Sequence, residues 1–233
     1  MSYRKTVRLG LLLLAGAATS ARAQETKNEF WPEFDTFVKH GGRIRVVFVD
    51  AFNQDQNTRN RQGSFSYFLD FALKPIFRRE LREKDDVFRR RFLTFRAGYQ
   101  FTTSFVSGDP SSERRAIAES TARCPLPGKF VVLDRNRGEF RFITGQPFSI
   151  RYRNRLWAER DVKLARLVFT PFAYGEIDYN TRFNAWTTNR YAAGIEFPVG
   201  PHVVIEPYML RQNDTRANPR HLQALGLTFN LYF

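Results

Sequence analysis

Cysteine and histidine are scarce in this sequence of 233 residues. Cys124 is the only cysteine, so the chain cannot form an internal disulfide. His40, His202 and His221 are the three histidines, and with one cysteine they give no ligand spacing for zinc or iron. There is also no phosphate-binding glycine loop. The sequence therefore predicts no bound metal, no cofactor and no recognisable catalytic residue set.

A second long apolar run is also missing. The first, Leu9 to Ala18, is shorter than the roughly 20 residues that a membrane-spanning helix needs. The mean hydropathy of −0.45 would ordinarily favour a soluble protein. A transmembrane β-barrel escapes that argument, because only alternate residues of each strand must face lipid.

The apolar run belongs to an N-terminal targeting segment. Arg4, Lys5 and Arg8 precede the run, and Ala21-Arg22-Ala23 follows it with the small-x-small pattern that signal peptidase cleaves. We therefore expect residues 1–23 to be a cleaved signal peptide and residues 24–233 to form one exported domain. Its mature end would be Gln24.

Basic residues outnumber acidic ones throughout the chain. The formal net charge is +14, and removal of the four bases in residues 1–23 lowers it to +10. In a cytosolic protein this excess would indicate nucleic acid. Behind an export signal we expect no nucleic acid, and instead the phosphates of lipopolysaccharide and other anionic lipids of the outer membrane as partners.

Alternation of apolar and polar residues is the main pattern of the mature chain. Along 93–102, Leu93, Phe95, Ala97, Tyr99 and Phe101 occupy one face, and polar or small residues occupy the other. A period of two indicates a β-strand. Eleven such segments occur, near 29–39, 43–53, 63–74, 91–103, 113–124, 129–142, 147–161, 166–179, 185–198, 202–213 and 219–233.

The connections between these segments alternate in length. Those at 40–42, 124–128 and 198–201 are tight, whereas those at 53–62, 104–113 and 212–219 are longer and polar. Short periplasmic turns and longer external loops are typical of outer-membrane barrels. We expect an all-β fold, an up-and-down antiparallel transmembrane β-barrel of 10 to 12 strands. Because bacterial barrels normally have an even number, the odd count implies a split or missed strand, or a first segment that lies inside the barrel or enters from the opposite side.

The C-terminus carries the most specific pattern. Leu225, Leu227, Phe229, Leu231 and Phe233 alternate up to the last residue. An apolar terminal strand is unusual in soluble proteins, where chain ends fray. It suits a strand that closes a barrel, because closure removes the unpaired edge. We interpret these residues as an assembly signal for the barrel-assembly machinery. A soluble sandwich is the alternative.

Several stretches resemble a family of uncharacterised Gram-negative outer-membrane proteins known only as a domain of unknown function. They are 28–34, 134–138, 152–155, 170–172, 190–194, 206–208, 211–213 and 224–227. The resemblance extends over the mature chain and implies a barrel in the outer membrane. It implies no activity and no catalytic residues.

Charged residues recur on the polar strand faces, which we assign to the lumen because a charge on the lipid face costs about 2–4 kcal/mol. These candidate site residues are Arg96, Arg115, Glu119, Arg123, Arg151, Arg153, Arg155, Glu159, Glu176, Arg190, Glu196 and Glu206, with Asp178 beside them.

Two functions follow from such a lumen. Arginines and carboxylates that pair across it would fill it and leave a plugged structural barrel. Unpaired arginines would instead line a narrow channel for small anionic or polar solutes. A lipid hydrolase is a third possibility, since His221 lies near an external loop and Ser104, Ser107, Ser111 and Ser112 occupy another.

The surface of the barrel carries two further expectations. Tyr152, Trp186, Tyr208 and Tyr232 fall near strand ends and are expected to form interfacial aromatic girdles. A basic connector at 78–91 is interpreted as a solvated turn or a contact for anionic lipid headgroups. No segment indicates a partner subunit, so we expect a monomer.

Overall fold

The chain folds into a single closed β-barrel. The computed structural model describes residues 26–56, 61–73, 91–105, 111–165, 167–217 and 220–233. The expected signal peptide, residues 1–23, and most of the connector at 78–91 lie outside these residues. The strands are β1 (Thr26–His40), β2 (Ile44–Asp55), β3 (Arg61–Ala72), β4 (Leu93–Phe105), β5 (Ser111–Leu126), β6 (Phe130–Ile143), β7 (Ser149–Arg160), β8 (Val162–Leu164), β9 (Leu167–Asn180), β10 (Ala185–Pro198), β11 (Val203–Asp214) and β12 (His221–Tyr232), with a 3₁₀ turn, η1 (Pro127–Lys129), before β6.

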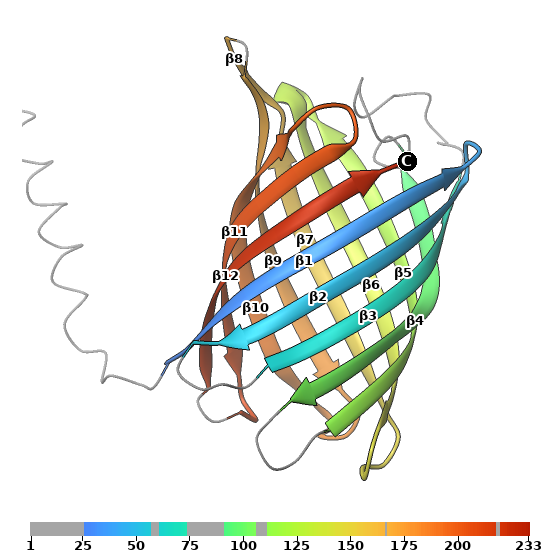
Figure 1. The fold of residues 1–233 in the computed structure, drawn as a ribbon, viewed down its shortest axis with the longest axis vertical. Coiled ribbons are helices and arrows are strands. Elements are labelled where there is room, and N and C mark those ends of the chain that lie inside the picture. Colours follow the sequence, from blue (N-terminus) through green and yellow to red (C-terminus); the bar gives the residue numbers. More distant parts are fainter. Residues whose placement is uncertain (1–25, 57–60, 74–90, 106–110, 166, 218–219) are drawn as a thin grey trace, which may run out of the picture.

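Eleven of these strands close the barrel. Consecutive long strands pair antiparallel, β10 pairs with β9, and the short β8 pairs only with β9. The barrel closes where β1 runs parallel to β12 (Figure 1). Each of the eleven segments expected from the sequence coincides with one barrel strand, with ends that differ by a few residues.

The expectation of an even strand number is therefore wrong. An all-antiparallel barrel needs an even number, because its first and last strands must run in opposite directions. Here the parallel pairing of β1 and β12 removes that requirement. The first strand enters from the end opposite to the C-terminus, which is one of the alternatives that the odd count left open (Figure 1).

The barrel is apolar outside and polar inside. In β3 the residues Phe65, Tyr67, Leu69 and Phe71 are exposed on the outer face, while the alternate residues Ser66, Phe68 and Asp70 are buried. The largest fully buried side chains include Glu139, Glu176 and Asp178. This is the reverse of a soluble protein, whose charged residues are rarely buried.

One polar cluster is an exception on the outer face of β6 and β7. Asn154 donates hydrogen bonds to Asp134 at 2.7 Å and to Asn136 at 3.1 Å, and the hydroxyl of Tyr152 donates to Asn136 at 2.5 Å. These side chains form hydrogen bonds with one another, so few of their polar groups are left without a partner on the outer face.

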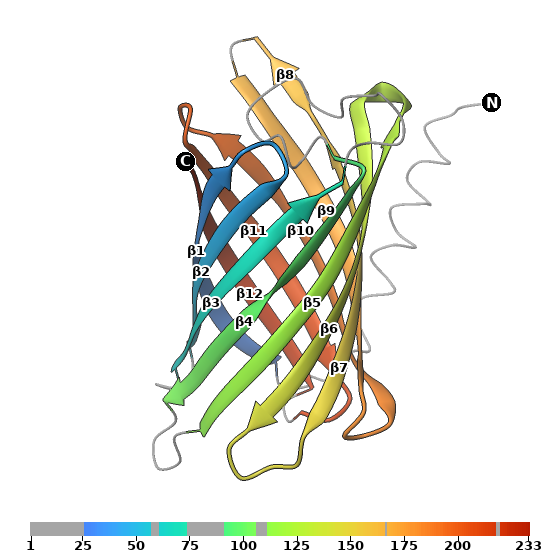
Figure 2. The same cartoon turned by 90° about the vertical axis from the view of Figure 1, so that its right-hand side faces the viewer.

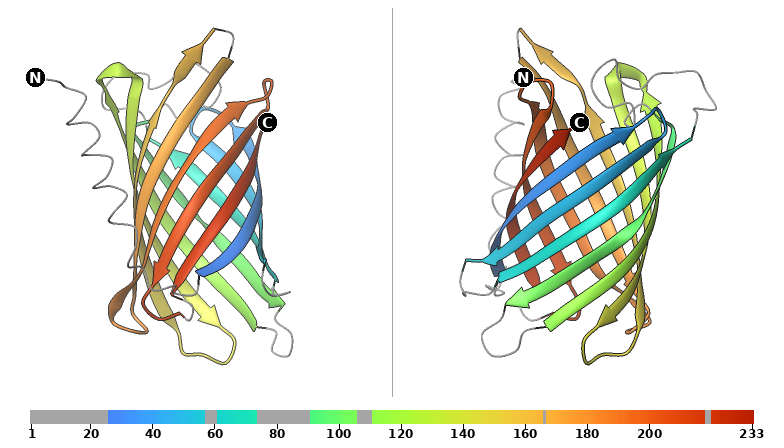
Figure 3. Two further views of the ribbon diagram at one scale, coloured as in Figure 1. Left: turned by 90° about the vertical axis from the view of Figure 1, so that its left-hand side faces the viewer. Right: turned by 45° about the vertical axis from the view of Figure 1, so that its right-hand side comes forward.

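The two ends of the barrel differ in their connections. The turns after β1, β5 and β10 lie at the end where the C-terminus lies, and Gly41, Gly128 and Gly200 there adopt positive φ angles that favour glycine (Figure 2). The hairpin of β8 and β9 extends beyond the barrel at this same end (Figure 3). Strands β2, β4 and β11 end at the opposite rim, so the short and the longer connections that the sequence singled out belong to opposite ends. The connection between β3 and β4, residues 73–92, is longer than any of them and belongs to the end with the short turns.

At the seam between β1 and β12, the last residue of the chain makes two backbone hydrogen bonds to β1. Lys39 donates its backbone N–H to the carbonyl of Phe233 at 2.8 Å, and Phe233 donates to the carbonyl of Phe37 at 2.8 Å. The rings of Phe34 and Phe229 stack across the seam outside the barrel, with centroids 5.0 Å apart. The C-terminal residue is thus part of barrel closure.

Tyr208 on β11 lies flat against its neighbouring strands inside the barrel. A Cβ atom at Gly226 of β12 would overlap the Tyr208 ring, and one at Gly194 of β10 would lie 2.6 Å from Tyr208 Cβ. The two glycines therefore provide the space that the tyrosine fills. Tyr208 faces the lumen and Tyr232 packs against the buried Phe37 cluster, so the expectation that these two tyrosines form an outer girdle is wrong. Trp186 is exposed and contacts Tyr152 and Tyr179 edge-on.

Within the described residues, no helix has the length and apolar character needed to cross a membrane.

Candidate functional site

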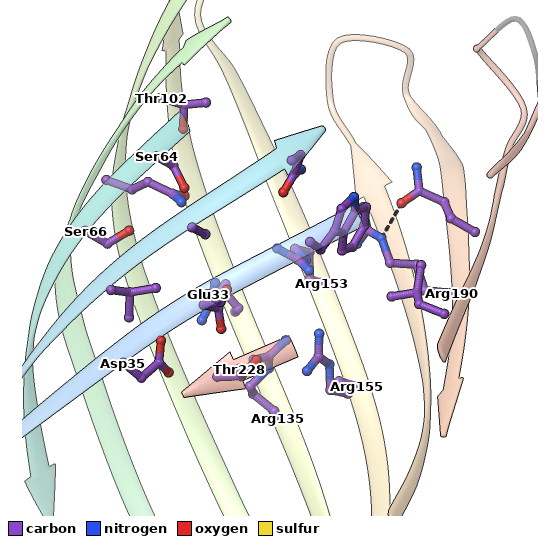
Figure 4. A pocket seen from close by; sticks show the side chains of 18 of the residues that line it. Glu33, Asp35, Ser64, Ser66, Thr102, Arg135, Arg153, Arg155, Arg190 and Thr228 are labelled. Atoms are coloured by element: carbon purple, nitrogen blue, oxygen red, sulfur yellow. Dashed lines mark hydrogen bonds between the residues drawn. The ribbon is translucent and has the colours of Figure 1, made fainter. Parts of the chain in front are cut away.

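The lumen holds a cavity of about 460 Å³ toward the end with the longer connections. Eight arginines and four carboxylates line it: Arg96, Arg115, Arg135, Arg137, Arg151, Arg153, Arg155 and Arg190, with Glu29, Glu33, Asp35 and Glu206. Figure 4 shows Glu33, Asp35, Arg135, Arg153, Arg155 and Arg190 in the space enclosed by the strands. Among the side chains that line the cavity, arginines therefore outnumber carboxylates.

Glu176 on β9 is the centre of the charge network in the wall. Its side chain is buried, and it accepts hydrogen bonds from Arg135 at 2.7 Å, Arg153 at 2.5 Å, Arg155 at 2.8 Å and Arg190 at 2.5 Å. Such charge-assisted hydrogen bonds are about twice as strong as neutral ones. One carboxylate thus fixes guanidinium groups from β6, β7 and β10.

Other buried carboxylates extend this network along the barrel. Glu139 accepts from Arg151 at 2.5 Å and from Arg153 at 3.0 Å. Glu119 accepts from Arg137 at 2.6 Å, and Glu113 accepts from Arg115 at 2.6 Å and Arg141 at 2.5 Å. On the far side, Asp70 accepts from Arg45 and Arg96, each at 2.6 Å. The arginine wall is held in place by carboxylates that lie behind it.

Several guanidinium groups keep N–H groups for the cavity. Arg155 donates through Nε to Glu176, and its guanidinium lies 3.9 Å from the centroid of the Tyr174 ring. Arg135 donates through Nη2 and Arg137 through Nε. The hydrogen bonds of the described residues do not include the remaining terminal N–H groups of these three arginines. They are available to a solute or to water.

An acidic pair faces the arginine wall. Glu33 and Asp35 lie two residues apart on the inner face of β1, and their carboxyl groups interact with each other. Arg155, Arg137 and Arg135 line the same cavity as Glu33. Among the described residues, no base lies within ion-pair distance of either carboxylate, and Asp35 Oδ1 is buried without a hydrogen-bond donor.

A second cavity, of about 200 Å³, lies toward the end with the short turns. Arg96, Arg135, Arg155, Trp157 and Glu206 border both cavities. These five side chains therefore form the layer that separates the two spaces along the barrel axis.

The structure brings the charged residues singled out in the sequence together inside the barrel. Arg96, Arg115, Arg151, Arg153, Arg155, Arg190 and Glu206 line the larger cavity, and Glu119, Arg123, Glu159 and Glu196 line the smaller one. Glu176 and Asp178 are buried in the wall between arginines. That these residues line a pore is still a prediction from the sequence.

Further lumen residues were not singled out in the sequence. They include Glu33, Asp35, Arg45, Asp70, Glu113, Arg135, Arg137, Glu139 and Arg141. Alternation over 135–141 places four of them on one strand face, and this signal could have identified them.

The histidines lie apart from the lumen charges. His202 Nδ1 is 2.7 Å from the backbone carbonyl of Tyr232, and its ring stacks on Phe233 at 6.0 Å. His221 Nδ1 is 2.7 Å from Asn213 Oδ1. The described residues contain no group of three or more His, Cys, Asp or Glu side chains that could hold a metal ion.

Comparison with known proteins gives a family without an assigned activity. A family model described as protein of unknown function (DUF2490) matches residues 87–223, more than half of the chain. The match runs from before β4 into the start of β12 and includes all the strands that carry the arginine wall. No curated protein matches the chain.

Proposed function

The chain belongs to the DUF2490 family of proteins of unknown function, and from its lumen we propose that it is an integral outer-membrane barrel with a narrow path for small anionic or polar solutes. The single observation that carries this proposal is the pair of cavities, about 460 Å³ and 200 Å³, that share one bordering layer along the barrel axis. The excess of arginine over carboxylate in the larger cavity favours anions.

The outer surface supports insertion in a membrane. Large apolar side chains are exposed on most of the long strands, for example Phe34, Phe65, Phe101, Leu156 and Leu225. The hydrocarbon core of a membrane does not tolerate an unpaired strand edge, and closure of the eleven barrel strands removes such edges. Residues 1–23 would direct export, and outer-membrane lipids and lipopolysaccharide would surround the mature barrel.

We assign two further roles within this proposal. The C-terminal strand, with Leu225, Leu227, Phe229, Leu231 and Phe233, would be the signal that the barrel-assembly machinery recognises. The end with short turns would face the periplasm. The protein would act as a monomer.

A plugged structural barrel is the second candidate, and the Glu176 network favours it. Four arginines on one carboxylate give a rigid wall, and the layer of Arg96, Arg135, Arg155, Trp157 and Glu206 interrupts the lumen. Such a barrel would serve envelope integrity without transport. Conductance separates the two candidates.

The test is single-channel recording of the mature protein, extracted from outer membranes and inserted in planar bilayers. We expect reproducible anion-selective current steps. Arg155→Gln should lower anion selectivity, because Arg155 borders both cavities. Arg114→Gln removes the same charge from the exposed outer face of β5 and should leave selectivity unchanged. A folded barrel that carries no current contradicts the channel proposal and favours the plugged barrel.

A further inference from the structure

The charges of the larger cavity are separated across the barrel. In the ring of eleven strands, β6 and β7 lie opposite β1. Arg135, Arg137, Arg151, Arg153 and Arg155 extend from β6 and β7, and the acidic pair Glu33 and Asp35 extends from β1. The cavity therefore has a positive wall and a negative wall that face each other.

The positive wall is built to accept an oxyanion. Glu176, Glu139 and Glu119 hold the arginines from behind, so the guanidinium groups are already oriented before a solute arrives. Arg135, Arg137 and Arg155 all line the cavity, and each keeps terminal N–H groups that donate to no described residue. Guanidinium groups match phosphate and carboxylate oxygens in geometry.

The negative wall is built to accept a donor or a cation. Asp35 Oδ1 is buried without a donor among the described residues. An acceptor without a donor is unfavourable, so a ligand that donates to this carboxylate relieves that cost. Calcium takes about six to eight oxygen ligands, and two carboxylates supply fewer than that. An ammonium group, with three donors, suits the pair better.

The space between the walls has the size and lining of a small-molecule site. Its volume of about 460 Å³ lies within the range of ligand pockets. Trp31, Trp157, Tyr174 and Tyr208 also line it, and Trp157 stacks on Tyr174 with ring centroids 5.2 Å apart. Trp31 extends from β1, as the acidic pair does, and an aromatic face there attracts an ammonium group, while Trp157 and Tyr174 on the arginine side cover the apolar part of a solute.

We propose that this cavity binds a small dipolar solute, with its oxyanion on the arginines of β6 and β7 and its ammonium group on Glu33 and Asp35. The inference deepens the proposed function and rests on it only for the entry of the solute into the lumen. A solute of this class would span the lumen, with one end on each wall, whereas net charge alone would attract an anion without orienting it.

The test compares three probes by titration of the intrinsic tryptophan fluorescence of the full mature protein in detergent. O-phosphoethanolamine carries both charges, inorganic phosphate only the anion, and ethanolamine only the ammonium. Trp31 and Trp157 line the cavity and report occupancy. We expect O-phosphoethanolamine to bind at least about tenfold more tightly than phosphate, the effect of roughly one charge-assisted hydrogen bond.

Two sets of variants assign the walls. Glu33→Gln with Asp35→Asn should weaken O-phosphoethanolamine about tenfold and leave phosphate binding unweakened, which also shows that the variant has folded. Arg155→Gln should weaken both probes. Equal affinity for phosphate and O-phosphoethanolamine overturns the proposal in favour of a simple anion site, and absence of binding by any probe also overturns it. A barrel that binds O-phosphoethanolamine but carries no current refutes the channel and leaves this site standing.

Discussion

At the scale of single residues, stability depends on buried carboxylates that neutralise the arginine wall. Glu139 is 0 % exposed and Glu176 is 2 % exposed, and each is in contact with more than one guanidinium group. Removing one partner of a buried ion pair is costly because the remaining charges stay buried. The carboxylates therefore set the positions of the arginines that face the cavity.

The substitution Glu176→Gln tests this dependence. It keeps the side-chain shape but leaves Arg135, Arg153, Arg155 and Arg190 without their shared carboxylate. We expect the free energy of unfolding to fall by about 3–5 kcal/mol. Urea unfolding in detergent, followed by tryptophan fluorescence, measures it. Glu33→Gln is the matched control, because no described base pairs with Glu33, and a loss as large there would refute the explanation.

For some strands the sequence predicts which face points into the barrel, and for others it does not. Arg151, Arg153 and Arg155 alternate with Ile150, Tyr152 and Leu156, so the lipid side was apparent. Around Arg135 and Arg137 the outer residues Asp134 and Asn136 are polar as well, so no apolar face marked the outside. The convergence of four arginines on Glu176 depends on the register between strands, which alternation does not determine.

At the scale of strands, the parallel seam is the feature that alternation alone did not decide, although the odd count of segments left it open. Segment boundaries followed from alternation and turn residues, and each expected segment became one strand. Strand direction at closure is different, because β1 alternates in the same way whether it pairs parallel or antiparallel. Trp31 and Phe37 on its inner face, with Phe30 and Phe34 on the other, also left its lumen side undecided.

Disulfide cross-linking in a Cys124→Ser background tests the seam. Asn28 and Gln223 are exposed register partners in β1 and β12, so the pair Asn28→Cys with Gln223→Cys should form a disulfide under oxidation. Gln223→Cys with Arg211→Cys, register partners in β12 and β11, is the positive control. Asn28→Cys with Arg211→Cys lies two strand spacings apart, about 10 Å, and should stay reduced. Failure of the first pair while the second forms would rule out the seam.

At the scale of the whole molecule, the two rims of the barrel predict its orientation. Cys124 is an exposed free cysteine beside η1, at the rim with the short turns. If that rim faces the periplasm, a large polyethylene glycol maleimide should label Cys124 only after the outer membrane is permeabilised. In a Cys124→Ser background, Gln146→Cys in the turn between β6 and β7 at the opposite rim should be labelled on intact cells. The reverse pattern would invert the orientation.

The odd number of strands has a consequence for where the barrel's first and last residues end up. Thr26 begins β1 at one rim and Phe233 closes the seam at the other. In a barrel with an even count both would return to a single compartment, and every strand could enter as half of a hairpin. Among the described residues, β1 has no hairpin partner before it. If the barrel spans the outer membrane as proposed, the start of β1 would have to cross the bilayer without a preceding strand as its hairpin partner.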